Sequence, residues 1–72
     1  MAADDEILKK HSVVIAGHQT SVTLENIFWS ELKKVAKTNG KSLKALITEI
    51  DEARTTNLSS AIRVYILRKI KD

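Results

Sequence analysis

The sequence predicts a mostly helical protein with a short β-ribbon near its N-terminal end. Residues 19–24 alternate in polarity, so that Thr20, Val22 and Leu24 fall on one side of an extended strand. Beyond residue 25 the apolar residues recur at the helical period of about 3.6. A strand this short cannot stand alone, because its backbone edges and its apolar side both need partners. We expect its partner to be the same strand of a second copy of the chain.

Length and composition favour oligomerisation. A chain of 72 residues forms one small domain whose core is marginal without further support. The chain has no cysteine, which excludes a disulfide framework and a thiolate zinc site. The remaining way to stabilise so small a core is to form a homodimer. The lack of cysteine also fits a protein of the bacterial cytosol.

The charge is unevenly distributed along the chain. Asp4, Asp5 and Glu6 lie together at the start, whereas twelve basic and only six acidic residues follow from position 9 onward. A dimer would double this positive excess, which favours a polyanionic partner. The alternative is that the charge serves solubility alone.

Neither a signal peptide nor a membrane span is predicted. The N-terminal residues are acidic where a signal peptide would be basic. The longest uncharged apolar run, Val13 to Ala16, is far shorter than the roughly 20 residues that a spanning helix needs. We therefore expect a soluble, cytoplasmic protein with no membrane partner.

The N-terminal part is predicted to contain an extra strand. Residues 1–10 are interpreted as a flexible tail and residues 11–72 as the folded domain. The β-branched run at residues 12–15 predicts a strand, and Gly17 predicts a turn. A loop over residues 16–19 would set Ile15 opposite Thr20 and Val13 opposite Val22, with Ser12, Val14, Ser21 and Thr23 on the other face. The first strand could instead be an arm that becomes ordered only on binding.

Three helices are predicted after the ribbon. The first covers residues 25–38 and stops at Asn39-Gly40, and Ser42 caps the second, whose apolar stripe ends near Ala53. Asn57 or Ser59 caps a third helix that runs through Lys71. Seven of the ten residues from Ala61 to Ile70 are apolar and surround the third helix. Such a helix is expected to lie between its own core and a partner subunit.

A run of lysines accompanies the turn between the first two helices. No acidic residue occurs from Leu32 to Thr48, and the stretch holds Lys33, Lys34, Lys37, Lys41 and Lys44. This run indicates phosphate binding. The alternative is a solvated helix face whose lysines interact with the helix dipole.

The order of these elements resembles the ribbon-helix-helix family of DNA-binding proteins. The turn segment Val35-Ala36-Lys37-Thr38-Asn39-Gly40-Lys41-Ser42 is similar to the inter-helix turn of the Arc repressor. Gly17-His18, residues 20–25, Phe28-Trp29 and residues 57–63 are similar to a bacterial stand-alone subfamily with an added third helix. The resemblance covers roughly residues 11–70.

The resemblance implies an intertwined homodimer that inserts an antiparallel ribbon into the DNA major groove and acts as a transcriptional repressor. The base contacts would be Gln19, Ser21 and Thr23, although the segment 19–24 carries no arginine or lysine. Phosphate would be held by backbone amides of Ser42, Leu43 and Lys44, with Lys41, Lys9 and Lys10 as further contacts. The implied dimer core comprises Val22, Leu24, Phe28, Leu32, Val35, Leu46, Ile47 and Ile50.

Other functional classes are less well supported. His11 and His18 could act as bases, but there is no thiol and no paired-carboxylate arrangement, so neither an enzyme nor a cofactor or metal site is expected. The alternative to DNA binding is an antitoxin-type or other interaction dimer whose third helix binds a partner protein.

Overall fold

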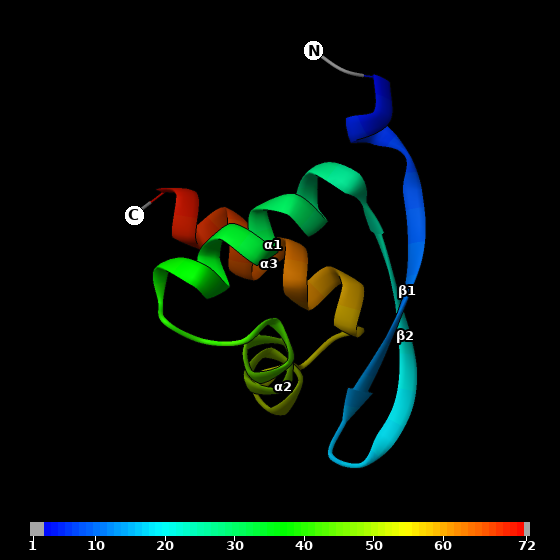
Figure 1. The fold of residues 1–72 in the computed structure, drawn as a ribbon, viewed down its shortest axis with the longest axis vertical. Helices are drawn as coiled ribbons and strands as arrows, with labels where there is room; N and C mark the ends of the chain where they lie inside the picture. Colours follow the sequence, from blue (N-terminus) through cyan, green and yellow to red (C-terminus); the bar gives the residue numbers. More distant parts are fainter. Residues whose placement is uncertain (1–2, 72) are drawn as a thin grey trace.

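The computed structural model describes residues 3–71 and contains a hairpin beside three helices (Figure 1). A short 3-10 turn leads into two strands, and the helices follow without further strands in the described residues. The elements in chain order are η1 (Ala3–Glu6), β1 (Leu8–Ile15), β2 (His18–Glu25), α1 (Asn26–Thr38), α2 (Leu43–Ala53) and α3 (Leu58–Lys71). The predicted fold class, mostly helical with an extra N-terminal strand before the strand at residues 19–24 and a third helix at the end, is confirmed, and the intertwined homodimer stays a prediction.

The hairpin register differs from the predicted one. Ile15 lies opposite His18 and Val13 opposite Thr20, so the loop holds only Ala16 and Gly17. These two residues have φ angles of 52° and 81°, as a type I′ turn requires. The pairing of Ile15 with Thr20 and of Val13 with Val22 is therefore wrong, because a two-residue turn of this type matches the strand twist and closes the hairpin earlier.

The predicted faces of the hairpin nevertheless hold. The register is shifted by two residues, and side chains alternate with a period of two, so every residue stays on its predicted face. Ile15, Val22 and Leu24 are buried on the face that meets the helices. Of the two arrangements left open for the first strand, the structure has the hairpin.

The folded region begins earlier than residue 11. Leu8, Lys9 and Lys10 belong to β1 and pair with the last residues of β2. The Asn26 side chain donates a hydrogen bond to the Asp4 carbonyl at 2.8 Å, which ties η1 to the start of α1. The boundary predicted between residues 10 and 11 therefore lies inside β1.

Helix ends follow the predicted capping residues. The N–H of Ala45 donates to the Ser42 hydroxyl at 3.0 Å, and the N–H of Ser60 donates to the Asn57 side-chain oxygen at 2.8 Å. Gly40 has a φ of 67°, a left-handed conformation that suits glycine after a helix. These local contacts set where α2 and α3 begin.

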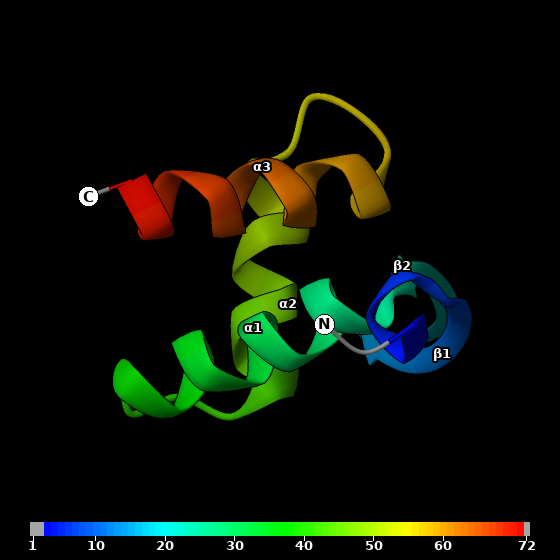
Figure 2. The same ribbon diagram turned by 90° about the horizontal axis from the view of Figure 1, so that it is seen from above.

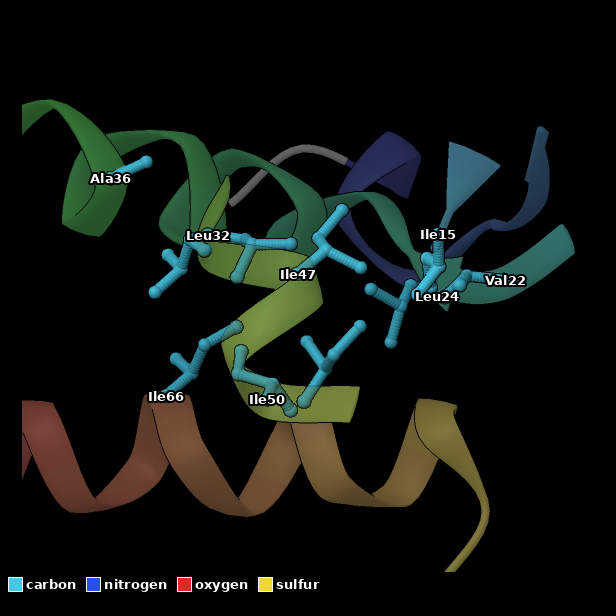
Figure 3. Packing of buried hydrophobic residues seen from close by; sticks show 10 residues of the cluster. Ile15, Val22, Leu24, Leu32, Ala36, Ile47, Ile50 and Ile66 are labelled. Carbon is cyan, nitrogen blue, oxygen red and sulfur yellow. The ribbon is translucent and has the colours of Figure 1, made fainter. Parts of the chain in front are cut away.

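The hydrophobic core closes within one chain. Figure 2 shows α2 crossing between α1 and α3, with the hairpin at the end where α1 begins. Of the implied dimer core, Val22, Leu24, Leu32, Leu46, Ile47 and Ile50 are buried and Phe28 and Val35 are partly buried; Ile15, Ala36, Ile62 and Ile66 complete the cluster (Figure 3). α3 thus covers a core that a second chain was expected to share.

The outer face of α3 remains apolar and exposed. Ile62 and Ile66 are fully buried, whereas Val64, Leu67 and Ile70 are 46%, 55% and 62% exposed. The third helix was predicted to pack on its own core, and its inner face does so in the structure. The contact of its outer half with a partner subunit stays a prediction.

An aromatic stack joins the hairpin to α1. The rings of His11 and Trp29 are stacked with centroids 3.7 Å apart and planes 6° from parallel. Nε2 of His11 is buried and has no hydrogen-bond partner among the described residues. Burial lowers the pKa of His11, and the positive charges of Lys9 and Lys33 lower it further.

An ion pair joins the end of β2 to α3. The Arg63 guanidinium donates to the Glu25 carboxylate at 2.9 Å, and this hydrogen bond lowers the pKa of Glu25 below its ordinary value. The same guanidinium lies 5.9 Å from the centroid of the Phe28 ring. Arg63 therefore connects the strand, α1 and α3 at one point.

The lowered pKa of His11 predicts a pH-dependent free energy of unfolding. Because the folded protein takes up the imidazole proton less readily than the unfolded chain, stability should be full above about pH 6.5 and fall as the pH drops below it. His11→Phe keeps an aromatic ring against Trp29 and should lack this part of the pH dependence. Denaturant unfolding between pH 8 and pH 5 measures both proteins, and an identical pH profile for the variant would contradict the prediction.

Candidate nucleic-acid interface

The three residues predicted to contact bases share the exposed face of β2. Gln19, Ser21 and Thr23 are all exposed and alternate with the buried Val22 and Leu24. They therefore project away from the helices on a common surface. We call the exposed side of the hairpin, formed by the even residues of β1 and the odd residues of β2, the outer face.

β1 doubles the width of the outer face. Val14 lies opposite Gln19, Ser12 opposite Ser21, and Lys10 opposite Thr23. Directly opposed side chains in an antiparallel pair have Cβ atoms about 4.5–5.5 Å apart, so each β1 residue adjoins one predicted base contact. The segment 19–24 itself has no arginine or lysine, but β1 brings Lys10 beside Thr23.

The place of Lys10 in the strand has a signal in the sequence. Lys10 and Ser12 are polar and two positions apart, as residues on one face of a strand would be, although Val14 at the next such position is apolar. The β-branched run alone predicts a strand that begins at Ser12, which leaves the two lysines in a tail. The paired strand at Leu8 to Ser12 shows that they belong to the sheet.

The two N-terminal lysines lie on opposite faces of the hairpin. Lys10 belongs to the outer face, whereas Lys9 lies opposite Leu24 on the face that carries the core. The charge of Lys9 is close enough to His11 to lower the pKa of that imidazole, and Lys33 of α1 acts on the same group. The structure therefore separates two residues that were predicted to bind phosphate together.

The start of α2 carries unpaired backbone donors. The Ser42 hydroxyl caps the helix by accepting a hydrogen bond from the N–H of Ala45. Within residues 3–71 the N–H groups of Ser42, Leu43 and Lys44 donate no hydrogen bond. Because these donors stand at the positive end of the helix dipole, this end of α2 suits an anion.

Two lysines of the turn region have acidic partners. Lys41 forms an ion pair with Glu49 of α2, and Lys34 pairs with Glu31 at 3.3 Å. In the described residues Lys33, Lys37 and Lys44 form no ion pair. Glu49 lies one residue beyond the acid-free stretch of the sequence. In the folded helix its carboxylate comes next to Lys41, so the start of α2 is not purely basic.

The described residues contain neither a cluster of metal-binding side chains nor a membrane-spanning helix. No group of three or more histidine, cysteine, aspartate or glutamate side chains among residues 3–71 is arranged to hold a metal ion. No helix in the same range is long and apolar enough to cross a membrane. Basic side chains gather at the start of β1, along the turn before α2 and in the last turn of α3, where Arg68, Lys69 and Lys71 lie.

Comparison with solved structures finds the same chain fold elsewhere. The structure matches an uncharacterized protein from Bordetella pertussis Tohama I with a TM-score of 0.82 and 27% sequence identity. The match covers 96% of this chain and 60% of that chain, so this chain spans less than two thirds of the length of the Bordetella protein. No curated protein matches the sequence significantly.

A family model supplies the classification. The model described as the ribbon-helix-helix domain matches residues 8–70, which begins at the first residue of β1 and ends one residue before the end of α3. Both the extra strand and the third helix therefore belong to the matched unit. Members of this family generally bind DNA in transcription regulation, and the chain belongs to the ribbon-helix-helix family.

Proposed function

We propose that the protein is a homodimeric transcriptional regulator, acting as a repressor, that binds specific sequences of double-stranded DNA. The observation that carries the proposal is the outer face of the hairpin, which presents Gln19, Ser21 and Thr23 side by side and exposed. A two-stranded β-ribbon has the dimensions to enter the major groove. A regulator of this type works where the chromosome is, in the cytoplasm of a bacterial cell.

The unpaired edge of β2 supports a homodimer. The sheet contains only β1 and β2 among the described residues, so β2 uses one edge and leaves the other without a strand. Unpaired strand edges are ready sites for pairing with another chain. Antiparallel pairing of two β2 strands about a twofold axis gives a four-stranded sheet in the order β1, β2, β2, β1.

This arrangement joins the outer faces of two hairpins. Gln19, Ser21 and Thr23 of both chains then lie on the two central strands, close to the twofold axis. Glutamine can bond to adenine through two hydrogen bonds, while serine and threonine can contact several bases. The resulting readout favours adenine-containing sites with twofold symmetry.

The start of α2 supports a phosphate contact. The free N–H groups of Ser42, Leu43 and Lys44 and the positive helix end can hold one phosphate of the DNA backbone. Lys44 adds a cation that has no acidic partner in the described residues. Lys41 would exchange Glu49 for the phosphate, which costs little because both side chains of this pair are exposed.

A second function is favoured by the outer face of α3. Val64, Leu67 and Ile70 are exposed, and Val64 also lines an open groove of about 400 Å³ beside Ala53 at the end of α2. An apolar surface of this kind fits a protein partner rather than a nucleic acid. α3 could therefore bind either a different protein or the second chain of the dimer.

The outer face should determine sequence preference. Gln19→Ala combined with Thr23→Ala should reduce the difference in affinity between a selected site and random DNA, since each good base contact is worth roughly 1–3 kcal/mol. Fluorescence anisotropy with a duplex selected from random DNA measures this difference. The matched control is Thr20→Ala, which changes an exposed β2 residue of the opposite face and should retain discrimination. Full discrimination by the double variant would refute the ribbon contacts.

The start of α2 should determine general affinity for DNA. Lys44→Ala should weaken binding to all sequences equally and lower the slope of log affinity against log salt by about 0.9 for each phosphate that the variant no longer binds. Glu49→Gln should strengthen binding, because it releases Lys41 from its ion pair. Lys71→Ala at the end of α3 removes the same charge and should leave the slope unchanged. Equal slopes for Lys44→Ala and the wild type would contradict the phosphate contact.

Sedimentation should identify the dimer surface. The wild-type protein should sediment as a dimer at micromolar concentration, and Leu67→Ser should remain a dimer because β2 pairs through its edge. A variant that becomes a folded monomer would instead show that α3 forms the interface. A wild-type protein that stays a compact monomer, with and without DNA, would refute the twofold ribbon.

A further inference from the structure

We propose that β1 lies along the edges of the major groove and that Lys10 binds the DNA phosphates there. This inference rests on the proposed DNA binding and adds a second strand to the contact surface. The sequence had placed Lys10 in a tail next to Lys9. The sheet register instead assigns the two lysines different positions and different roles.

The outer face is continuous from β2 to β1. Lys10 and Ser12 are exposed and stand directly opposite Thr23 and Ser21. Opposed side chains of an antiparallel pair are about 4.5–5.5 Å apart at Cβ. DNA that contacts Thr23 therefore comes within reach of the long Lys10 side chain.

The width of the sheet indicates which part of the DNA β1 meets. Neighbouring strands lie about 4.8 Å apart, so the two central β2 strands with their side chains occupy a major groove that is about 12 Å wide. The two β1 strands are then about 14 Å from each other, which is wider than the groove. They come to lie over its edges, where the sugar-phosphate backbones run.

The charges around Lys10 leave it available. It forms no ion pair among the described residues, and the nearest acidic residue of the strands, Glu25, is held by Arg63 of α3. The acidic η1 turn precedes β1 and lies at the end of the hairpin away from the Ala16-Gly17 turn (Figure 1). Lys10 is the one lysine of the outer face and lies two residues from the end of β1 that these acidic groups flank.

The proposal withdraws the phosphate contact that was expected of Lys9, so that Lys9 provides a control within the same strand. It is exposed and has the same charge, but it belongs to the inner face, opposite Leu24 and near His11 and Lys33. Removal of either lysine changes the net charge by the same amount. A difference between the two variants therefore reports the face of the hairpin and not the long-range electrostatic attraction.

The experiment compares Lys10→Ala and Lys9→Ala by fluorescence anisotropy on a random-sequence duplex and on the selected site, between about 50 and 200 mM KCl. Lys10→Ala should lower the slope of log affinity against log salt by about 0.9 for each phosphate that is no longer bound, hence by nearly two units in a dimer. Discrimination between the two duplexes should be unchanged. Lys9→Ala should retain the wild-type slope, and circular dichroism checks that both variants are folded.

Three results would overturn the inference. Equal slopes for the two variants would show that only net charge matters. A loss of sequence discrimination in Lys10→Ala would place Lys10 inside the groove on a base edge. Wild-type slope in Lys10→Ala, with DNA binding intact, would refute the inference alone, whereas a wild-type protein that binds no duplex would refute the proposed function as well.

Discussion

The packing of the hairpin on the helices is the contact on which the rest of the structure depends. Ile15, Val22 and Leu24 enter the core from one side of the hairpin, and the ring of His11 stacks on Trp29 beside them. Burial of one face forces the alternate residues outward, because side chains of a strand alternate between its faces. Core packing on one face of the hairpin therefore suffices to expose the polar residues of β2 on the other face.

α3 changes what a second chain has to contribute. Ile62 and Ile66 cover the apolar surfaces of α1 and α2, so the core is complete in one chain. The β2 edge and the outer face of α3 are two surfaces of this chain that stay open to a second chain.

Acidic groups on other elements lie beside several of the basic residues. Glu49 pairs with Lys41 at the start of α2, Glu25 is occupied by Arg63, and the η1 acids flank β1. Exposed pairs of this kind add little stability, since solvent screens them. Their effect is to decide which basic side chains have an acidic partner, and net charge does not show this.

The sequence by itself determined the three helices, their caps and the faces of the strands, but not the early start of β1 at Leu8. The period of two around Val22, the helical period after residue 25, and the capping residues Ser42 and Asn57 all act over a few residues, so local patterns suffice to predict them. The family and its fold class also followed from these segments, whereas the contact residues proposed for DNA remain predictions.

Only the tertiary structure decided the hairpin register, the separation of Lys9 from Lys10, the closure of the core by α3 and the pairing of Lys41 with Glu49. The register depends on the turn type, and the predicted four-residue loop and the observed two-residue loop keep the same faces, so hydrophobic patterning does not distinguish them. The other three depend on which elements meet in space. Those contacts join residues on different elements, so local sequence patterns do not predict them.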